Sequence, residues 1–149
     1  MKILVLGAGG MAGHVIALTL QEKGYEVTGI ARRPLSFCPV RVLDVSDADA
    51  LQEELNYGEY DAVVNAVGVL NKAVSANPCA GIWTNACFPH WLALATENLP
   101  TRVIHLSTDC VFSGKRGGYT EEDFKDGENI VCHYMCKKKE VQKTSWATA

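Results

Sequence analysis

The stretch GAGGMAGH, residues 7–14, is the feature that most restricts what this chain can fold into. It follows a short, continuous apolar run, KILVLG at 2–7, which is typical of a strand buried on both faces. It leads into residues 11–24, where apolar residues recur at helical spacing and Gly24 suits the end of a helix. The sequence therefore predicts a strand, a tight glycine turn and a helix in direct succession.

Glycines at such a turn have a chemical use. A side chain there would block the close approach of the backbone to a diphosphate, and the N-terminus of a helix offers N–H groups and a positive dipole end to an anion. Gly7, Gly9 and Ala12 match the G-x-G-x-x-A spacing of dinucleotide-binding turns. Gly7, Gly10 and Gly13 match a G-x-x-G-x-x-G variant. The alternative is a tight turn that binds no ligand. The place of the glycine stretch directly between a strand and a helix favours dinucleotide binding.

Beyond the turn, short apolar runs continue to alternate with amphipathic segments. The further predicted strands are 25–32, 41–45, 60–68 and 102–108. The further predicted helices are 46–56 with Ser46 or Asp47 as its cap, 78–97 with a kink or break at Pro89, and the weakly patterned 130–143. The polar, glycine-rich residues 113–129 predict a loop. We therefore expect one α/β domain over 1–149, a Rossmann-type doubly wound parallel sheet with helices on both faces and ligand-binding loops at the carboxyl ends of its strands.

Composition excludes several other classes of protein. The net charge of −3 gives no electrostatic reason to expect nucleic acid as a partner. No apolar run reaches the roughly 18 residues that span a bilayer, and residues 1–10 do not fit a cleavable signal peptide. We therefore expect a cytoplasmic protein with no membrane partner. The six cysteines show no disulfide pattern, and Cys132, His133 and Cys136 lack a second ligand pair, so no metal site is predicted.

The second predicted strand ends in two arginines. A cofactor with a free ribose 2′-hydroxyl usually meets an acidic residue about twenty residues beyond the glycines. Arg32 and Arg33 occupy that place here, and guanidinium groups suit a 2′-phosphate. The sequence therefore favours NADP as the cofactor, with NAD as the alternative.

Three motifs, GAGGMAGH (7–14), NAVG (65–68) and STDCVFSG (107–114), in this order resemble the extended short-chain dehydrogenase/reductase superfamily. Within it they resemble most the dTDP-4-dehydrorhamnose reductase branch, where GxxGMxGH and STDYVFDG are typical. The segment YTEED (119–123) is also similar to the one that follows in that branch. The likeness covers about residues 1–124. It implies an NADP-dependent reductase of a keto group on a nucleotide-activated sugar.

The resemblance also implies roles for individual residues. The cofactor would be held by the glycine turn, the strand ends and the central helix, together with the two arginines: Gly7, Gly9, Gly10, Met11, Gly13, Arg32, Arg33, Asp44, Val45, Asn65, Ala66, Gly68, Asn85 and Ser107. Asp44 would lie near the adenine. Thr108 would hydrogen-bond the substrate carbonyl, and Tyr134 and Lys138 would form the family's Y-x-x-x-K pair.

The spacing of Tyr134 and Lys138 suits that chemistry, because residues four apart share one face of a helix. The tyrosine would give a proton to the carbonyl oxygen as hydride reaches the carbon. A free phenol has a pKa of about 10, and a neighbouring lysine and an oxidised nicotinamide would both lower the pKa of Tyr134 by favouring the phenolate. Thr108 would share the negative charge that develops on the oxygen. An ordinary basic, solvated helix is the alternative for this segment.

Residues 130–149 form an atypical tail. Where the family typically has YGRSKLLGE, this chain has YMCKKKEVQ. Family members are roughly twice as long, so we expect a sheet truncated after about five strands, without the sixth strand or the substrate domain, as a truncated or frameshifted reading frame would produce. A non-catalytic dinucleotide-binding module and a nucleotide-sugar epimerase or dehydratase are therefore alternatives to the reductase. The sheet edge left open predicts self-association into a homodimer.

Overall fold

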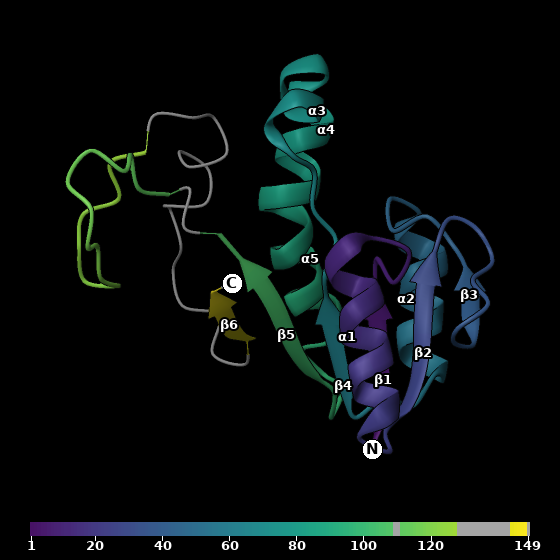
Figure 1. Ribbon diagram of the computed structural model, residues 1–149. Coiled ribbons are helices and arrows are strands. Elements are labelled where there is room, and N and C mark those ends of the chain that lie inside the picture. Colours follow the sequence, from purple (N-terminus) through teal and green to yellow (C-terminus); the bar gives the residue numbers. More distant parts are fainter. Residues whose placement is uncertain (109–110, 128–143, 149) are drawn as a thin grey trace.

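The computed structural model describes residues 1–108, 111–127 and 144–148 (Figure 1). Its strands form one parallel sheet with the order β3-β2-β1-β4-β5-β6. The strands are β1 Lys2–Leu6, β2 Glu26–Ala31, β3 Val40–Val42, β4 Ala62–Asn65, β5 Arg102–Ser107 and β6 Thr144–Thr148. The helices are α1 Met11–Glu22, α2 Ala48–Tyr57, α3 Asn71–Ala76, α4 Pro78–Ile82, the π-helical turn Trp83–Cys87 and α5 Phe88–Ala95.

The order of the strands reverses at β1. The chain first moves outward from β1 to β2 and β3, and then returns to place β4 on the other side of β1. Leu6, at the end of β1, is paired with Ile30 on one side and with Asn65 on the other. The loops that leave β1 and β4 therefore diverge from the same edge of the sheet, which is where open α/β sheets form ligand crevices.

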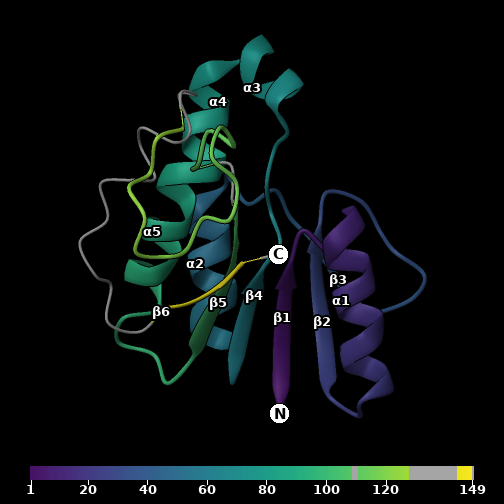
Figure 2. The same cartoon turned by 60° about the vertical axis from the view of Figure 1, so that its left-hand side comes forward.

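Helices cover both faces of the sheet, with a separate apolar cluster under each (Figure 2). On one face Ile3 and Val5 of β1 pack with Ala17 of α1. On the other, the alternate residues Leu4 and Leu6 pack with residues of α2 and α5, among them Leu51, Leu55, Phe88 and Leu92. The predicted fold class, a doubly wound parallel sheet with helices on both faces, is confirmed.

The first helix ends where the sequence predicts. Gly24 has φ of +82°, and its N–H donates to the carbonyl of Gln21, while Tyr25 N–H donates to Leu20 O, which completes a glycine-dependent helix end. The cap of α2 is Asp47, whose Oδ1 accepts a hydrogen bond of 3.1 Å from Ala50 N–H.

The expectation that the sixth strand is absent is wrong. Thr144–Thr148 pairs in parallel with β5, and Trp146 stands opposite His105 in the register. The expectation rested on the length of family members rather than on this segment's own pattern. An edge strand bonds to a neighbour on one side only, so it needs no continuous apolar run of the kind that made β1 easy to predict.

Three other elements differ from the prediction. The third strand covers Val40–Val42 rather than 41–45, because Asp44 forms a local turn with Ser46 instead of continuing the ladder. The predicted helix 78–97 is interrupted by the π-helical turn directly before α5 rather than at Pro89 itself. Pro89 has no N–H for the carbonyl of Asn85 and its ring crowds that carbonyl, and a wider turn relieves both. Helix α3 was not predicted.

The predicted loop 113–129 is irregular as far as residue 127. The predicted helix 130–143 lies outside the described residues. In the part of the chain whose placement is described, no helix has both the length and the apolar character needed to cross a membrane.

Candidate functional site

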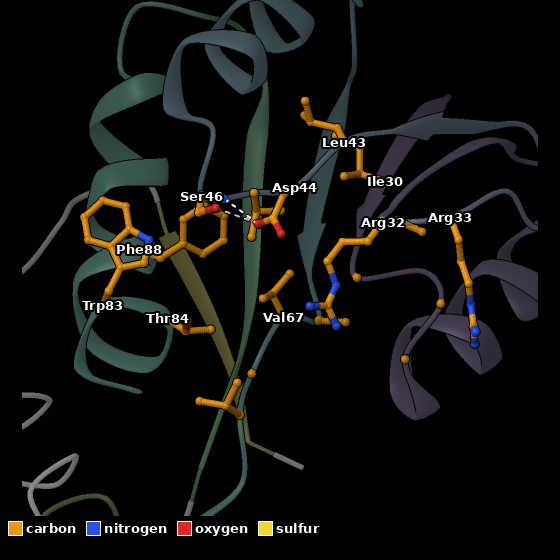
Figure 3. A pocket seen from close by; sticks show the side chains of 18 residues that line it. Ile30, Arg32, Arg33, Leu43, Asp44, Ser46, Val67, Trp83, Thr84 and Phe88 are labelled. Carbon is orange, nitrogen blue, oxygen red and sulfur yellow. Dashed lines mark hydrogen bonds between the residues drawn. The ribbon is translucent and has the colours of Figure 1, made fainter. Parts of the chain in front are cut away.

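A cleft of about 700 Å³ lies at the carboxyl ends of β1, β2 and β4, where the order of the strands reverses (Figure 3). Its walls come from the turn after β1, the segments after β2, β3 and β4, and the helical turn before α5. Nine of the residues that the sequence predicts around a cofactor line it: Gly7, Gly9, Gly10, Arg32, Arg33, Asp44, Val45, Ala66 and Gly68. Segments distant in sequence converge here, so this cleft is the candidate functional site.

The glycine turn is held between β2 and the loop after β4. Gly7 has φ of +76°, a conformation that side chains disfavour, and its N–H and that of Ala8 both donate to the carbonyl of Ile30 at 3.0 Å. A Cβ on Gly7 would lie 3.1 Å from Val67 Cγ2 and 3.2 Å from Ala66 O. The turn therefore rests directly on the segment after β4, and only a glycine leaves room for that contact.

The N-terminus of α1 opens from this turn. Its N-cap is Gly10, no side chain caps the helix, and no acidic residue lies in the first turn. The first N–H groups of a helix have no partner within the helix, and here no carboxylate competes for them. Since Gly9 and Gly10 line the cleft, an anion in the cleft has the positive end of the α1 dipole beside it.

Two predicted residues of this helix do not line the cleft. Met11 is 90% exposed. Gly13 is buried, and a Cβ there would lie 2.7 Å from the carbonyl carbon of Gly7, 3.0 Å from Ala8 Cα and closer still to the Gly7 oxygen. Gly13 therefore allows α1 to pack on the glycine turn and has no direct contact with the cleft.

The end of the cleft next to β2 is cationic. Arg32 and Arg33 directly follow β2, both are exposed, and both side chains extend beside the cleft in Figure 3. Asp44 is the acidic residue in this lining, and its Oδ1 accepts hydrogen bonds from Ser46 N–H at 3.0 Å and Ser46 Oγ at 2.8 Å. These bonds, with a smaller contribution from Arg32, hold the pKa of Asp44 below its usual value. Asp44 is therefore an ionised acceptor near neutral pH.

Asn65 and Asn85 do not line the cleft but fix the wall formed by the segment after β4. Asn65 is fully buried, and its Oδ1 accepts a hydrogen bond of 3.0 Å from Val67 N–H. Asn85, in the π-helical turn, bonds to both backbone groups of Val69: Oδ1 accepts from Val69 N–H at 2.9 Å, and Nδ2 donates to Val69 O at 2.8 Å. A residue at each end of the wall is thus held by an amide side chain.

Sequence reasoning missed the aromatic side of the cleft. Trp83, Thr84 and Phe88 line it, and in Figure 3 Trp83 and Phe88 lie across the cleft from the two arginines. Helical periodicity predicted a helix here but not which residues face the cleft, because the π-helical turn changes the phase of the helix. Pro89 is the sequence signal that predicts such a disturbance. The smaller apolar residues Val67 and Val69, which also line the cleft, were missed as well. The sequence predicts a strand as far as residue 68, whereas β4 ends at Asn65 and leaves these residues in the loop that follows.

The segment after β5 is held together by hydrogen bonds and an ion pair among its own residues, 113–126. Ser113 donates through its N–H and Oγ to the carboxylate of Asp126 at 2.8 and 2.6 Å, and Tyr119 OH also donates to Asp126 at 3.2 Å. Arg116 pairs with Asp123 and lies over the ring of Tyr119. The bond from Arg116 lowers the pKa of Asp123 to about 2, and the bonds from Ser113 lower the pKa of Asp126.

A family model described as the NAD dependent epimerase/dehydratase family matches residues 3–148, nearly the whole chain. The chain belongs to this family. The resemblance to dTDP-4-dehydrorhamnose reductases is also confirmed, since proteins of that name are among its curated relatives.

Two curated relatives and one solved structure show how similar known proteins are to this family member. The probable low-salt glycan biosynthesis reductase Agl14 of Haloferax volcanii is 32% identical over 125 residues, which cover 82% of this chain and 42% of the relative. The dTDP-4-dehydrorhamnose reductase of Streptomyces griseus is 30% identical over 137 residues, 91% of this chain and 42% of the relative. A solved dTDP-4-dehydrorhamnose reductase of Bacillus anthracis, in complex with NADP, superposes with a TM-score of 0.81 and 17% identity over 99% of this chain and 52% of that one. This chain therefore spans about half, or less, of the length of these relatives.

The predicted catalytic residues of this epimerase/dehydratase family member are described only in part. Thr108 directly follows β5, is half-buried and is not among the residues that line the cleft. The same holds for Ser107, the last residue of β5, which the sequence predicts at the cofactor rather than in the chemical step. Tyr134 and Lys138 lie outside the described residues. The proposed arrangement of Thr108, Tyr134 and Lys138 therefore stays a prediction from the sequence.

Proposed function

We propose that this chain forms the NADP-binding part of a reductase that acts on a keto group of a nucleotide-activated sugar. The observation that carries the proposal is the cleft itself. A glycine turn and an uncapped helix N-terminus form one part of its wall, and a pair of arginines follows the neighbouring strand. This combination of a glycine-lined helix N-terminus with added positive charge suits a phosphorylated dinucleotide.

The residues present fit such a cofactor. The turn Gly7–Gly10 and the first N–H groups of α1 would hold the diphosphate. Arg32 and Arg33 would hold the 2′-phosphate, and no acidic residue stands in their place to favour a free 2′-hydroxyl. Asp44 and Val45 would lie beside the adenine. When bound, the reduced dinucleotide would supply the hydride.

Three residues of this chain would carry out the chemical step. Thr108 would hydrogen-bond the carbonyl oxygen of the substrate and share its developing charge. Tyr134 would donate the proton to that oxygen, and Lys138 would lower the pKa of the Tyr134 phenol by favouring its ionised form. The support comes from the Y-x-x-x-K spacing and from the reductases among the relatives.

Epimerase or dehydratase chemistry is the second candidate, because the matching family is described by those two activities. Both candidates use the same cleft and the same dinucleotide. They differ in whether the cofactor is consumed: a reductase leaves it oxidised, whereas an epimerase or dehydratase returns it to its starting state.

Cofactor titration followed by turnover tests the proposal. Fluorescence titration of the protein with NADPH and with NADH should show tighter binding of NADPH, and a variant lacking both arginines (Arg32→Ala with Arg33→Ala) should lose that preference. Arg41→Ala is a matched control, since Arg41 pairs with Glu54 away from the cleft and should leave the preference intact.

A panel of nucleotide-activated keto sugars then separates the activities. NADPH oxidation in proportion to product supports the reductase, and product without net oxidation supports the second candidate. Binding without any turnover would leave a non-catalytic dinucleotide-binding module. Failure of both NADPH and NADH to bind would refute the proposal as a whole.

A further inference from the structure

His105 is a buried, titratable residue for which the proposed chemistry has no use. It lies on β5, it is 3% exposed, and it stands directly opposite Asn65 of β4 in the parallel register. Asn65 Nδ2 lies 3.1 Å from His105 Nδ1. Two polar side chains on adjacent central strands are thus bonded to each other in the interior, next to the end of β4 from which the wall of the cleft begins.

The direction of each hydrogen bond in this chain of groups is fixed. Val67 N–H can only donate, so the Asn65 atom that it reaches must be the carbonyl oxygen Oδ1. The atom of Asn65 that faces His105 is then Nδ2, which can only donate. His105 Nδ1 must therefore accept, and the proton of the neutral ring is on Nε2.

This chain of bonds ends at the wall of the cleft. Val67 lines the cleft and lies against the glycine turn. A Cβ added at Gly7 would be only 3.1 Å from Val67 Cγ2. A shift of Val67 would therefore move the surface on which the glycine turn rests. His105 is not among the residues that line the cleft, and its contact with Asn65 connects it to the wall.

We propose that His105 is a positioning residue for the cofactor cleft: its Nδ1 accepts from Asn65, which orients the Asn65 carbonyl oxygen to hold Val67 N–H and the wall beside the glycine turn. The role in binding rests on the proposed function. The orientation of the groups does not, because it concerns the protein without cofactor.

Two substitutions of His105 distinguish the effect of its hydrogen-bond acceptor from the effect of its aromatic ring. His105→Phe keeps an aromatic ring but removes the acceptor, so the buried Asn65 N–H loses its partner and the amide is free to rotate away from Val67. His105→Asn keeps an acceptor, because asparagine Oδ1 is bonded to Cγ just as histidine Nδ1 is. Val103→Ala is the matched control, since Val103 is a buried residue two positions earlier on the same strand and has no polar contact with Asn65.

The first measurement needs no cofactor. Nitrogen-15 NMR of the full chain should show a neutral His105 ring protonated at Nε2, and the Val67 amide should be protected from hydrogen exchange. Protection of Val67 should fall in His105→Phe and persist in His105→Asn and Val103→Ala. A ring protonated at Nδ1, or Val67 protection unchanged in a folded His105→Phe protein, would overturn the proposal.

The second measurement is the dissociation constant for NADPH. We expect a rise of about tenfold, equivalent to roughly 1.4 kcal/mol, in His105→Phe, with recovery toward the wild-type value in His105→Asn and no change in Val103→Ala. Equal affinity in all four proteins would refute the positioning role. If the wild-type protein binds no dinucleotide, the proposed function fails, while the NMR result still decides whether His105 orients Asn65.

Discussion

Replacing Gly13 with alanine tests whether the glycines of the turn have separate tasks. A methyl group at Gly13 would lie 2.7 Å from the carbonyl carbon of Gly7 and 3.0 Å from Ala8 Cα. All of these neighbours are backbone atoms, so no side chain can rotate away, and α1 must move off the turn. The substitution should therefore disturb both the fold and the cleft.

The expected magnitude can be worked from two opposing effects. Alanine in place of glycine within a helix is favoured by about 1 kcal/mol through its higher helix propensity. Forcing a methyl group into a packed interior typically costs about 1–3 kcal/mol, and more where only backbone can yield. Because the neighbours here are backbone atoms, we take a cost of about 3 kcal/mol. Less the gain of about 1 kcal/mol from helix propensity, the net loss in the free energy of unfolding is about 2 kcal/mol, or a fall of about 4–8 °C in the thermal midpoint for a chain of this size.

Gly9→Ala is the matched comparison. A Cβ on Gly9 would lie 3.6 Å from Ala31 Cβ and from Leu35 Cδ2, which are ordinary contacts, and the φ of Gly9 is not positive. Its stability should stay within about 0.5 kcal/mol of the wild type. Because Gly9 lines the cleft, the added methyl group should nevertheless weaken dinucleotide binding by about tenfold or more.

Urea unfolding followed by circular dichroism and fluorescence titration with NADPH measure the two quantities on the same samples. We expect lower stability and weak NADPH binding for Gly13→Ala, and normal stability with weak NADPH binding for Gly9→Ala. An unfolding midpoint of Gly13→Ala equal to that of the wild type would refute the view that this glycine permits α1 to pack on the turn.

Three further predictions concern the remaining parts of the cleft and the loop beyond it. Reversing charge with Arg32→Glu or Arg33→Glu should weaken NADPH binding more than NADH binding, and equal losses in paired titrations would argue against contact with a 2′-phosphate. Asn85→Asp, which removes the N–H donor to Val69 O, should weaken NADPH binding about tenfold with little change in fold by circular dichroism; unchanged affinity would show that this bond does not hold the wall. Asp123 has its pKa lowered to about 2, below the unfolded value of about 3.9, so its stabilising contribution is present above pH 4 or so and is lost as the pH falls toward about 2. Hydrogen exchange of residues 113–127 should therefore increase over that acidic range in the wild type and show a smaller change in Asp123→Asn.

Local patterns were enough to predict much of the fold. The strand–turn–helix unit at the N-terminus is specified by neighbouring residues alone, since an apolar run, a glycine with positive φ and a helical stripe each act over a few residues. The alternation of such units implies a parallel sheet and places its loops at one edge. For the same reason, nine residues predicted to surround a cofactor do line one cleft.

Tertiary structure decided what depends on distant contacts. That Asn65 meets His105 follows from the pairing of β4 with β5, and that Trp83 faces the cleft follows from the π-helical turn that Pro89 provokes. The sixth strand forms by adding to the edge of β5, which no pattern within Thr144–Thr148 reveals. Sequence alone determined the position of the site and its glycine-rich end, because those depend on short-range backbone conformation. The tertiary fold decided which side chains complete the cleft and which only support it, because those relations exist only after distant segments have packed together.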